Sequence, residues 1–139
     1  MNKNEDPDTT TNYCIAKVSA GFPSPADDYL EKDLNLDNFL IKNRPSTFLI
    51  RAGGDSMINV GIYEGDILVV DRSIEAKNKD IIVAVIFGEL TVKKIIFKEK
   101  KEDLELHSAN PTYPNIKIKN KEEFTIWGVV TFAIHQFIK

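Results

Sequence analysis

Residues 80–97 read DIIVAVIFGELTVKKIIF, two runs rich in aliphatic and β-branched residues on either side of Gly88. Such runs are typical of β-strands, and a glycine between them supplies the positive φ that a tight turn needs. We predict a hairpin in which strands 80–87 and 90–97 are joined by a two-residue type II′ turn at Gly88. This hairpin determines where Lys93 lies.

Short β-branched runs continue on both sides of the hairpin and predict a mostly β fold of antiparallel strands. The expected strands are residues 47–51, 66–71, 80–87, 90–97, 104–107, 116–118 and 125–134. Between residues 27 and 41 the apolar positions have a patchy helical spacing, so we expect one or two short helical turns there.

The first 28 residues have a different composition from the rest of the chain. They are polar, show little periodicity and contain Pro23 and Pro25, which hold the backbone locally extended. A chain of 139 residues that is 42% hydrophobic is long enough for one compact domain. We therefore expect a flexible N-terminal arm over residues 1–28 and a β-rich domain over residues 29–139.

Composition excludes several classes of function. The net charge of −3 argues against direct sequence-specific DNA binding. Cys14 is the single cysteine, and with His107 and His135 it forms no zinc-type spacing, so we expect no metal and no cofactor. Both histidines are expected to be ordinary strand residues, because no acidic or cysteine partner lies at catalytic or ligand spacing in the sequence. Residues 1–12 contain no signal sequence and residues 124–138 are too short to span a membrane, which indicates a cytoplasmic protein.

A glycine-rich turn and a strand lysine are the candidate catalytic groups. Residues 53–57 read GGDSM, and the small residues before Ser56 allow a sharp turn that projects its hydroxyl. An ordinary surface turn is the alternative interpretation. In residues 90–97 either Lys93 or Lys94 points toward the apolar face, and the strand alternation alone does not say which. A serine beside an inward lysine is what a Ser-Lys hydrolytic dyad requires.

Such a dyad needs a neutral lysine, because only an unprotonated amine can accept the proton of the serine hydroxyl. Burial in an apolar strand can lower a lysine pKa from about 10.4 to roughly 7 or 8. The backbone N–H groups of Asp55, Ser56 and Met57 are the candidate donors of an oxyanion hole.

Four blocks of the chain, in order, resemble the LexA-type self-cleaving serine peptidases, most closely the branch that takes part in SOS mutagenesis. These blocks are residues 21–29, 54–58, 64–71 and 91–94. The resemblance runs from about residue 17 to the C-terminus. It implies a β-rich Ser-Lys peptidase domain in which Ser56 is the nucleophile and Lys93, not Lys94, is the general base.

The same resemblance implies a substrate and partners. By position, Ala20-Gly21 is similar to the bond that such proteins cut in their own chain. Cleavage is expected to be stimulated by a RecA filament on single-stranded DNA. The cleaved homodimer is then expected to serve as the accessory subunit of an error-prone translesion DNA polymerase, bound to a UmuC-type subunit and possibly to the sliding clamp.

Other interpretations stay open. Twenty residues before the cleavage site are too few for the DNA-binding domain of a repressor, and the membrane anchor of a signal peptidase is not found. A non-catalytic regulatory module for a polymerase or repressor, with a vestigial dyad, is the main alternative. A fragment that binds another repressor is a third hypothesis.

Overall fold

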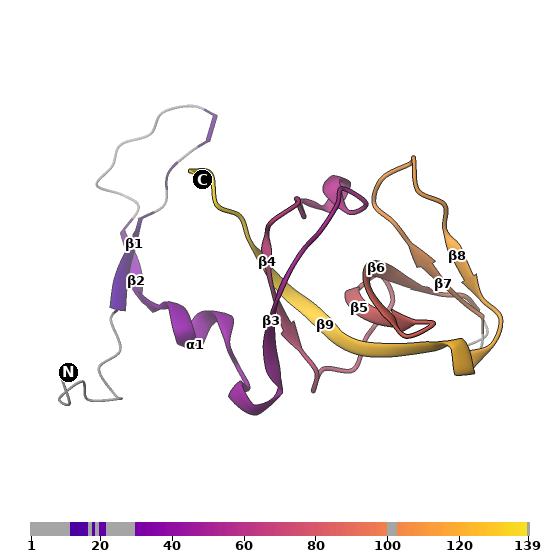
Figure 1. Ribbon diagram of the computed structural model, residues 1–139. Coiled ribbons are helices and arrows are strands. Elements are labelled where there is room, and N and C mark those ends of the chain that lie inside the picture. Colours follow the sequence, from indigo (N-terminus) through magenta and orange to yellow (C-terminus); the bar gives the residue numbers. More distant parts are fainter. Residues whose placement is uncertain (1–11, 17, 19, 22–29, 100–102, 139) are drawn as a thin grey trace, which may run out of the picture. The chain divides into compact units, whose positions relative to one another are not determined.

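The computed structural model describes most of the chain after residue 11 (Figure 1). The described residues are 12–16, 18, 20, 21, 30–99 and 103–138. The chain divides into two compact units, residues 1–42 and residues 43–139. This division lies further along the chain than residue 28, where we expected the arm to end.

The first unit contains a two-stranded antiparallel sheet and one short helix. Strand β1 (Asn12–Ala16) pairs with β2 (Leu30–Asn35), and α1 (Leu36–Leu40) follows directly. The Asn35 side chain accepts a hydrogen bond of 2.8 Å from the Asn38 N–H and caps the helix. The first strand lies in the segment that we expected to be a flexible arm.

The predicted helical turns are confirmed for residues 36–40 but are wrong for residues 30–35, which form a strand. Leucines at positions 30 and 34 share a face in a helix and also share a face in a strand. Their spacing therefore cannot separate the two structures. Pairing with β1 decides in favour of the strand.

The second unit is built on one seven-stranded sheet in the order β3-β4-β9-β5-β6-β7-β8, and every neighbouring pair is antiparallel (Figure 1). This confirms the mostly β fold. All seven strands were predicted, with ends that differ by no more than one residue. Their bounds are β3 (Thr47–Arg51), β4 (Ile67–Asp71), β5 (Ile81–Ile86), β6 (Glu89–Phe97), β7 (Leu104–His107), β8 (Ile116–Ile118) and β9 (Phe124–Ile134). Short 3-10 helices are η2 (Arg44–Ser46), η3 (Ile58–Val60) and η4 (Lys121–Glu123).

The predicted hairpin joins β5 to β6, with Ile86 paired to Glu89. Its two central residues both have positive φ, 50° at Phe87 and 80° at Gly88. Two positive values define a type I′ turn, so the predicted type II′ turn is wrong. The prediction considered only Gly88, whereas the right-handed twist of the paired strands also holds Phe87 in the left-handed region.

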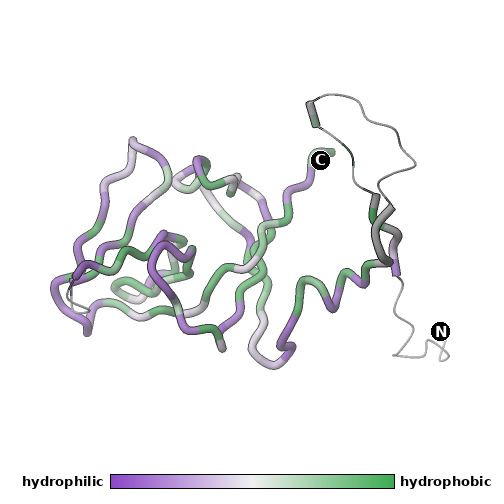
Figure 2. The backbone as a smooth tube through the Cα atoms, turned by 180° about the vertical axis from the view of Figure 1, so that it is seen from behind, coloured by the Kyte–Doolittle hydropathy of each residue, from purple (hydrophilic) through white to green (hydrophobic). Residues whose placement is uncertain are grey.

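The sheet carries hydrophobic side chains on both faces, and β5 contributes to both. Val83 belongs to one buried cluster with Met57 and Leu68, whereas Ile82 belongs to a second cluster with Leu106. Neighbouring residues of a strand point to opposite faces, which explains the division. Figure 2 shows hydrophobic stretches along the strands alternating with hydrophilic turns.

Strand β9 is the long strand between β4 and β5, and Gly128 in it lies close to the Val70 side chain (Figure 1). A Cβ atom on Gly128 would lie 2.6 Å from Cγ1 of Val70, so only glycine fits this position. None of the helices in the described part of the chain has the length and hydropathy of a membrane span.

Candidate active site

Ser56 lies in a turn that leads from β3 into η3. Gly54 has φ of 74°, a conformation that glycine adopts without strain. Met57 is 3% exposed and packs against the same hydrophobic cluster as Ala52, whereas Ser56 is only half-buried. The methionine anchors the turn in the core and leaves the serine hydroxyl accessible.

Two backbone hydrogen bonds close the base of this turn. The Ala52 N–H donates to the Asp66 carbonyl, and the Gly65 N–H donates back to the Ala52 carbonyl, both at 2.8 Å. The Asp66 side chain is 1% exposed and accepts a hydrogen bond of 2.9 Å from the Tyr63 N–H. The segment between residues 52 and 66 is therefore a closed loop with a fixed base.

Both histidines have an acidic neighbour in the folded chain. His135 Nδ1 lies 2.5 Å from Oδ1 of Asp66, and His107 Nε2 lies 3.6 Å from Oε2 of Glu105. The first pair is separated by 69 residues, and only the sheet order β4-β9 brings them together. Because His135 reaches Asp66 from the end of β9, it supports the base of the loop that carries Ser56.

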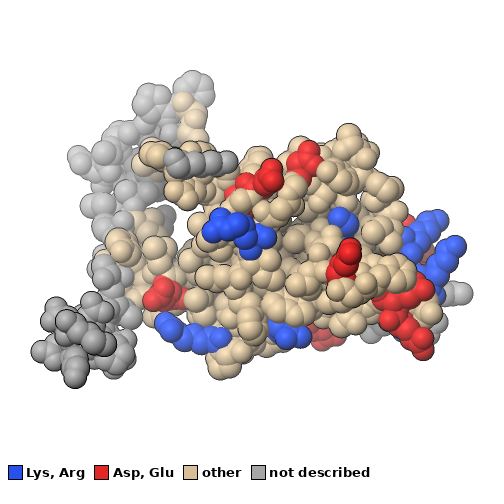
Figure 3. Space-filling model, in the orientation of Figure 1, with Lys and Arg blue, Asp and Glu red and all other residues tan. Residues whose placement is uncertain are grey.

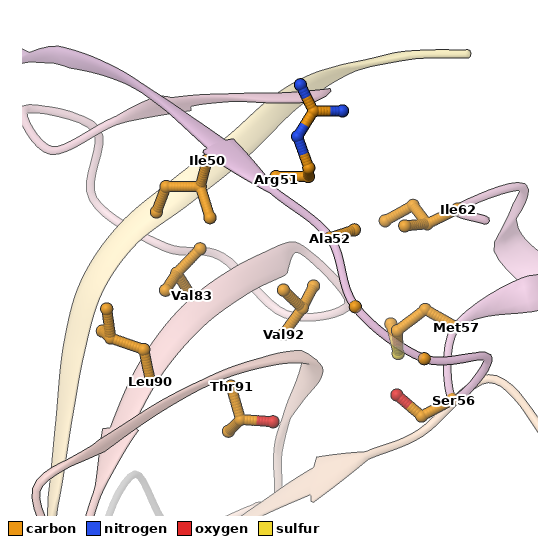
Figure 4. Close-up of a pocket in the computed structure, with 12 residues that line it drawn as sticks. Ile50, Arg51, Ala52, Ser56, Met57, Ile62, Val83, Leu90, Thr91 and Val92 are labelled. Atoms are coloured by element: carbon orange, nitrogen blue, oxygen red, sulfur yellow. The ribbon is translucent and has the colours of Figure 1, made fainter. Parts of the chain in front are cut away.

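Ser56 lines a cavity of about 310 Å³ between the turn and β6 (Figure 4). The hydroxyls of Ser56 and Thr91 face each other in this view, with Val92 beside them. Aliphatic side chains form most of the remaining wall. The lining residues are Ile50, Arg51, Ala52, Gly53, Gly54, Ser56, Met57, Ile62, Val83, Leu90, Thr91 and Val92.

Lys93 follows Thr91 and Val92 in β6, and it is the buried lysine of the pair. It is 8% exposed, whereas Lys94 is half-buried, so the structure resolves the choice that strand alternation left open. Lys93 pairs with the fully buried Ile82 and lies on the same face as Ile95. Burial in these apolar surroundings lowers the pKa of Lys93 below the ordinary value of 10.5.

The backbone around Ser56 offers hydrogen-bond donors. Within the described part of the chain, the N–H groups of Asp55, Ser56 and Met57 donate to no protein acceptor, whereas the Ile58 N–H donates to the Asp55 carbonyl at 3.3 Å. Donors without a protein acceptor beside a serine hydroxyl are suited to binding a negatively charged oxygen.

The predicted cleavage site lies in the first compact unit. Ala20 and Gly21 are exposed and form a bend. The segment with Pro23 and Pro25 lies outside the described residues. An exposed bend can present a peptide bond to a protease without unfolding of a core element.

Comparison with known proteins identifies the family. The Peptidase S24-like family matches residues 13–131. Protein SamA of Salmonella typhimurium is 40% identical over 92% of this chain and 87% of SamA. Protein ImpA of Escherichia coli is 41% identical over 86% of this chain and 80% of ImpA, and Protein MucA of the same species is 36% identical over 88% and 82%. These relatives are UmuD-like, which confirms the resemblance inferred from the motifs. The chain belongs to the Peptidase S24-like family and is a serine peptidase of its self-cleaving, SOS-response branch.

Proposed function

We propose that Ser56 and Lys93 form a Ser-Lys dyad that cuts the Ala20-Gly21 bond of this protein. The observation that supports the proposal is an accessible serine in a cavity whose wall includes part of β6, the strand that carries a buried lysine. Ser56 shares its cavity with the residues that directly precede Lys93, and burial lowers the pKa of that lysine. A lysine with a lowered pKa is more often neutral, which is the form that a general base requires.

In this mechanism the Lys93 amine takes the proton of the Ser56 hydroxyl, and Oγ attacks the carbonyl carbon of Ala20. The backbone N–H groups of Asp55, Ser56 and Met57 are the proposed donors that stabilise the resulting oxyanion. Lys93 then gives the proton to the nitrogen of Gly21, which leaves as the new N-terminus. Water, deprotonated by Lys93, hydrolyses the ester on Ser56 and releases residues 1–20 with a free carboxylate on Ala20.

The test is self-cleavage of the purified full chain at alkaline pH, followed by mass spectrometry. We expect products of residues 1–20 and 21–139 from the wild type and from Lys94→Ala, the matched control for the neighbouring lysine. Ser56→Ala and Lys93→Ala should stay intact. Cleavage of Ser56→Ala at the wild-type rate would show that Ser56 is not the nucleophile.

We further propose that the cleaved chain acts in the cytoplasm as a homodimeric subunit of a translesion polymerase. A RecA filament is the proposed activator, a UmuC-type protein the catalytic partner and the sliding clamp a further contact. Acidic and basic side chains are interspersed on the face shown in Figure 3, which supports protein partners rather than direct DNA binding. Light scattering of residues 21–139 and co-purification with a UmuC-type subunit test the dimer and the partner. An intact mass after incubation with an activated RecA filament would instead favour a non-catalytic regulatory module.

A further inference from the structure

The loop that follows β7 contacts the turn that carries Ser56, although the two are more than 50 residues apart. Asn110 is 8% exposed, and its Nδ2 donates a hydrogen bond of 3.0 Å to the Asp55 carbonyl. Its Oδ1 accepts from the N–H of Thr112 at 3.1 Å and from the hydroxyl of Thr112 at 2.9 Å. Since the Thr112 N–H can only donate, it fixes the amide so that Nδ2 faces Asp55.

The bond to the Asp55 carbonyl has a consequence for Ser56. The carbonyl of Asp55 and the N–H of Ser56 belong to one planar trans peptide group, in which C=O and N–H point in opposite directions. Holding the carbonyl therefore also sets the direction of the Ser56 N–H. The Ile58 N–H reaches the same carbonyl at 3.3 Å, a longer bond than that from Asn110.

We propose that Asn110 is a positioning residue, which orients the peptide group between Asp55 and Ser56 so that the Ser56 N–H is ready to bind the oxyanion. This inference rests on the proposed function, in which Ser56 is the nucleophile. Asn110 touches neither substrate nor the reacting atoms and acts only through the backbone. An oxyanion donor must be aimed before the reaction, because reorienting a peptide group during the reaction would raise the barrier.

Other contacts of this loop hold the turn but leave that peptide group unconstrained. The Tyr113 hydroxyl donates to Oδ1 of the Asp55 side chain at 2.5 Å, and this carboxylate raises the pKa of Tyr113. The Asn59 N–H donates to the Ala109 carbonyl at 2.9 Å. Loss of the Tyr113 contact should therefore have a much smaller effect on the reaction than loss of the Asn110 contact.

The decisive variant is Asn110→Asp. It keeps an oxygen for both bonds from Thr112 but places a second carboxylate oxygen, which cannot donate, against the Asp55 carbonyl. The matched control is Asn115→Asp, the same chemical change at an exposed asparagine close by in the chain. Tyr113→Phe is the second control. Removal of an oxyanion donor typically slows a reaction by about 10²- to 10³-fold, and we expect misalignment to slow it by roughly 10- to 100-fold.

Two measurements on the full chain distinguish positioning from general destabilisation. The first is the rate of self-cleavage across the alkaline pH range. Asn110→Asp should lower the plateau of the rate at high pH without moving the midpoint of the pH profile, which Lys93 sets. The cleavage rates of both controls should stay within about threefold of the wild-type rate. The second is the rate at which a fluorophosphonate modifies Ser56. This reaction needs no docked arm, and its rate in Asn110→Asp should fall in the same proportion as the cleavage rate.

The outcomes separate this inference from the proposed function. If the wild type neither cleaves itself nor reacts with the fluorophosphonate at Ser56, the proposed function is wrong. If the wild type does both and Asn110→Asp matches Asn115→Asp, only the role of Asn110 is wrong. Thermal unfolding verifies that each variant is folded, and Asn110→Ala, which adds no charge, makes the same comparison if Asn110→Asp unfolds.

Discussion

Two glycine-containing turns of the second unit differ in what holds them. The proposed catalytic turn, residues 53–57, and the hairpin turn, Phe87-Gly88, each contain a glycine with φ between 74° and 80°. The proposed catalytic turn is anchored by a buried methionine and by the hydrogen bond that Asn110 donates to the Asp55 carbonyl. The hairpin turn has at its tip Phe87, which is 76% exposed, and one backbone bond of 3.3 Å to the Glu123 carbonyl.

The difference shows that two turns with similar glycines obtain their shapes from different sources. Adjacent paired strands impose the hairpin turn, because the pairing of Ile86 with Glu89 leaves only two residues to connect them. Residues far away in the chain impose the shape of the catalytic turn. Disturbing the hairpin turn should therefore change stability alone, whereas disturbing the catalytic turn should also change the reaction.

The largest expected effect comes from Lys93→Met, which leaves both turns in place and removes the proposed base. Self-cleavage should fall by about 10²- to 10⁴-fold, the usual contribution of a general base. In the wild type the rate should rise with pH and level off below the pKa of 10.5 of an ordinary lysine, because burial lowers the pKa of Lys93. Quantifying the intact chain by mass spectrometry across alkaline pH measures both effects. A wild-type rate in Lys93→Met would contradict the proposed base.

A smaller effect should distinguish the two turns directly. Alanine is strained at the positive φ of Gly54 and Gly88 by about 1 kcal/mol, and open space surrounds both positions. Gly54→Ala and Gly88→Ala should therefore lower the free energy of unfolding by similar amounts in urea denaturation. Only Gly54→Ala should slow self-cleavage. If the same strain of about 1 kcal/mol is added to the activation barrier, the rate falls by about tenfold. Equal slowing in both variants would remove the distinction between the turns.

The buried amine should also reduce stability. Because the pKa of Lys93 is lowered in the folded state, the unfolded chain binds more protons between that pKa and 10.5, and stability rises with pH across this window. Below this pH window Lys93 is charged in both states, and the folded protein carries the full free-energy cost of burying that charge. Lys93→Met should therefore raise the free energy of unfolding at neutral pH by about 1 kcal/mol and remove the pH dependence. Urea denaturation at neutral and alkaline pH tests this, and an unchanged stability would indicate that Lys93 is hydrated.

The smallest expected effect is a gain in stability at the hairpin tip. Asparagine adopts positive φ more readily than phenylalanine, and Asn-Gly is the preferred pair in a type I′ turn. Phe87→Asn should raise the free energy of unfolding by about 0.5 kcal/mol without changing self-cleavage. Phe87→Leu, which keeps the strain, is the matched control and should give no gain. Slower cleavage in Phe87→Asn would show that the hairpin tip takes part in the reaction.

Much of the sheet was predictable because β-branched runs, glycines and polar breaks are local signals. The seven strands follow them closely. The strand at residues 30–35 was missed because its leucine spacing also fits a helix and only its partner, β1, distinguishes them. The type I′ turn was missed because the positive φ of Phe87 depends on strand twist rather than on its own preference.

In the candidate site, too, some features follow from local sequence signals and others from tertiary contacts. Small residues before Ser56 and the alternation of β6 are local properties, and they identify Ser56 and the pair Lys93 and Lys94 as candidates. The choice of Lys93 and the Ala20-Gly21 bond came from the resemblance to the family. Burial of Lys93, the contact between Asp66 and His135, and the bond from Asn110 to Asp55 exist only in the folded chain. They depend on which strands are neighbours, and a sheet of non-local pairings brings together residues that no sequence spacing connects.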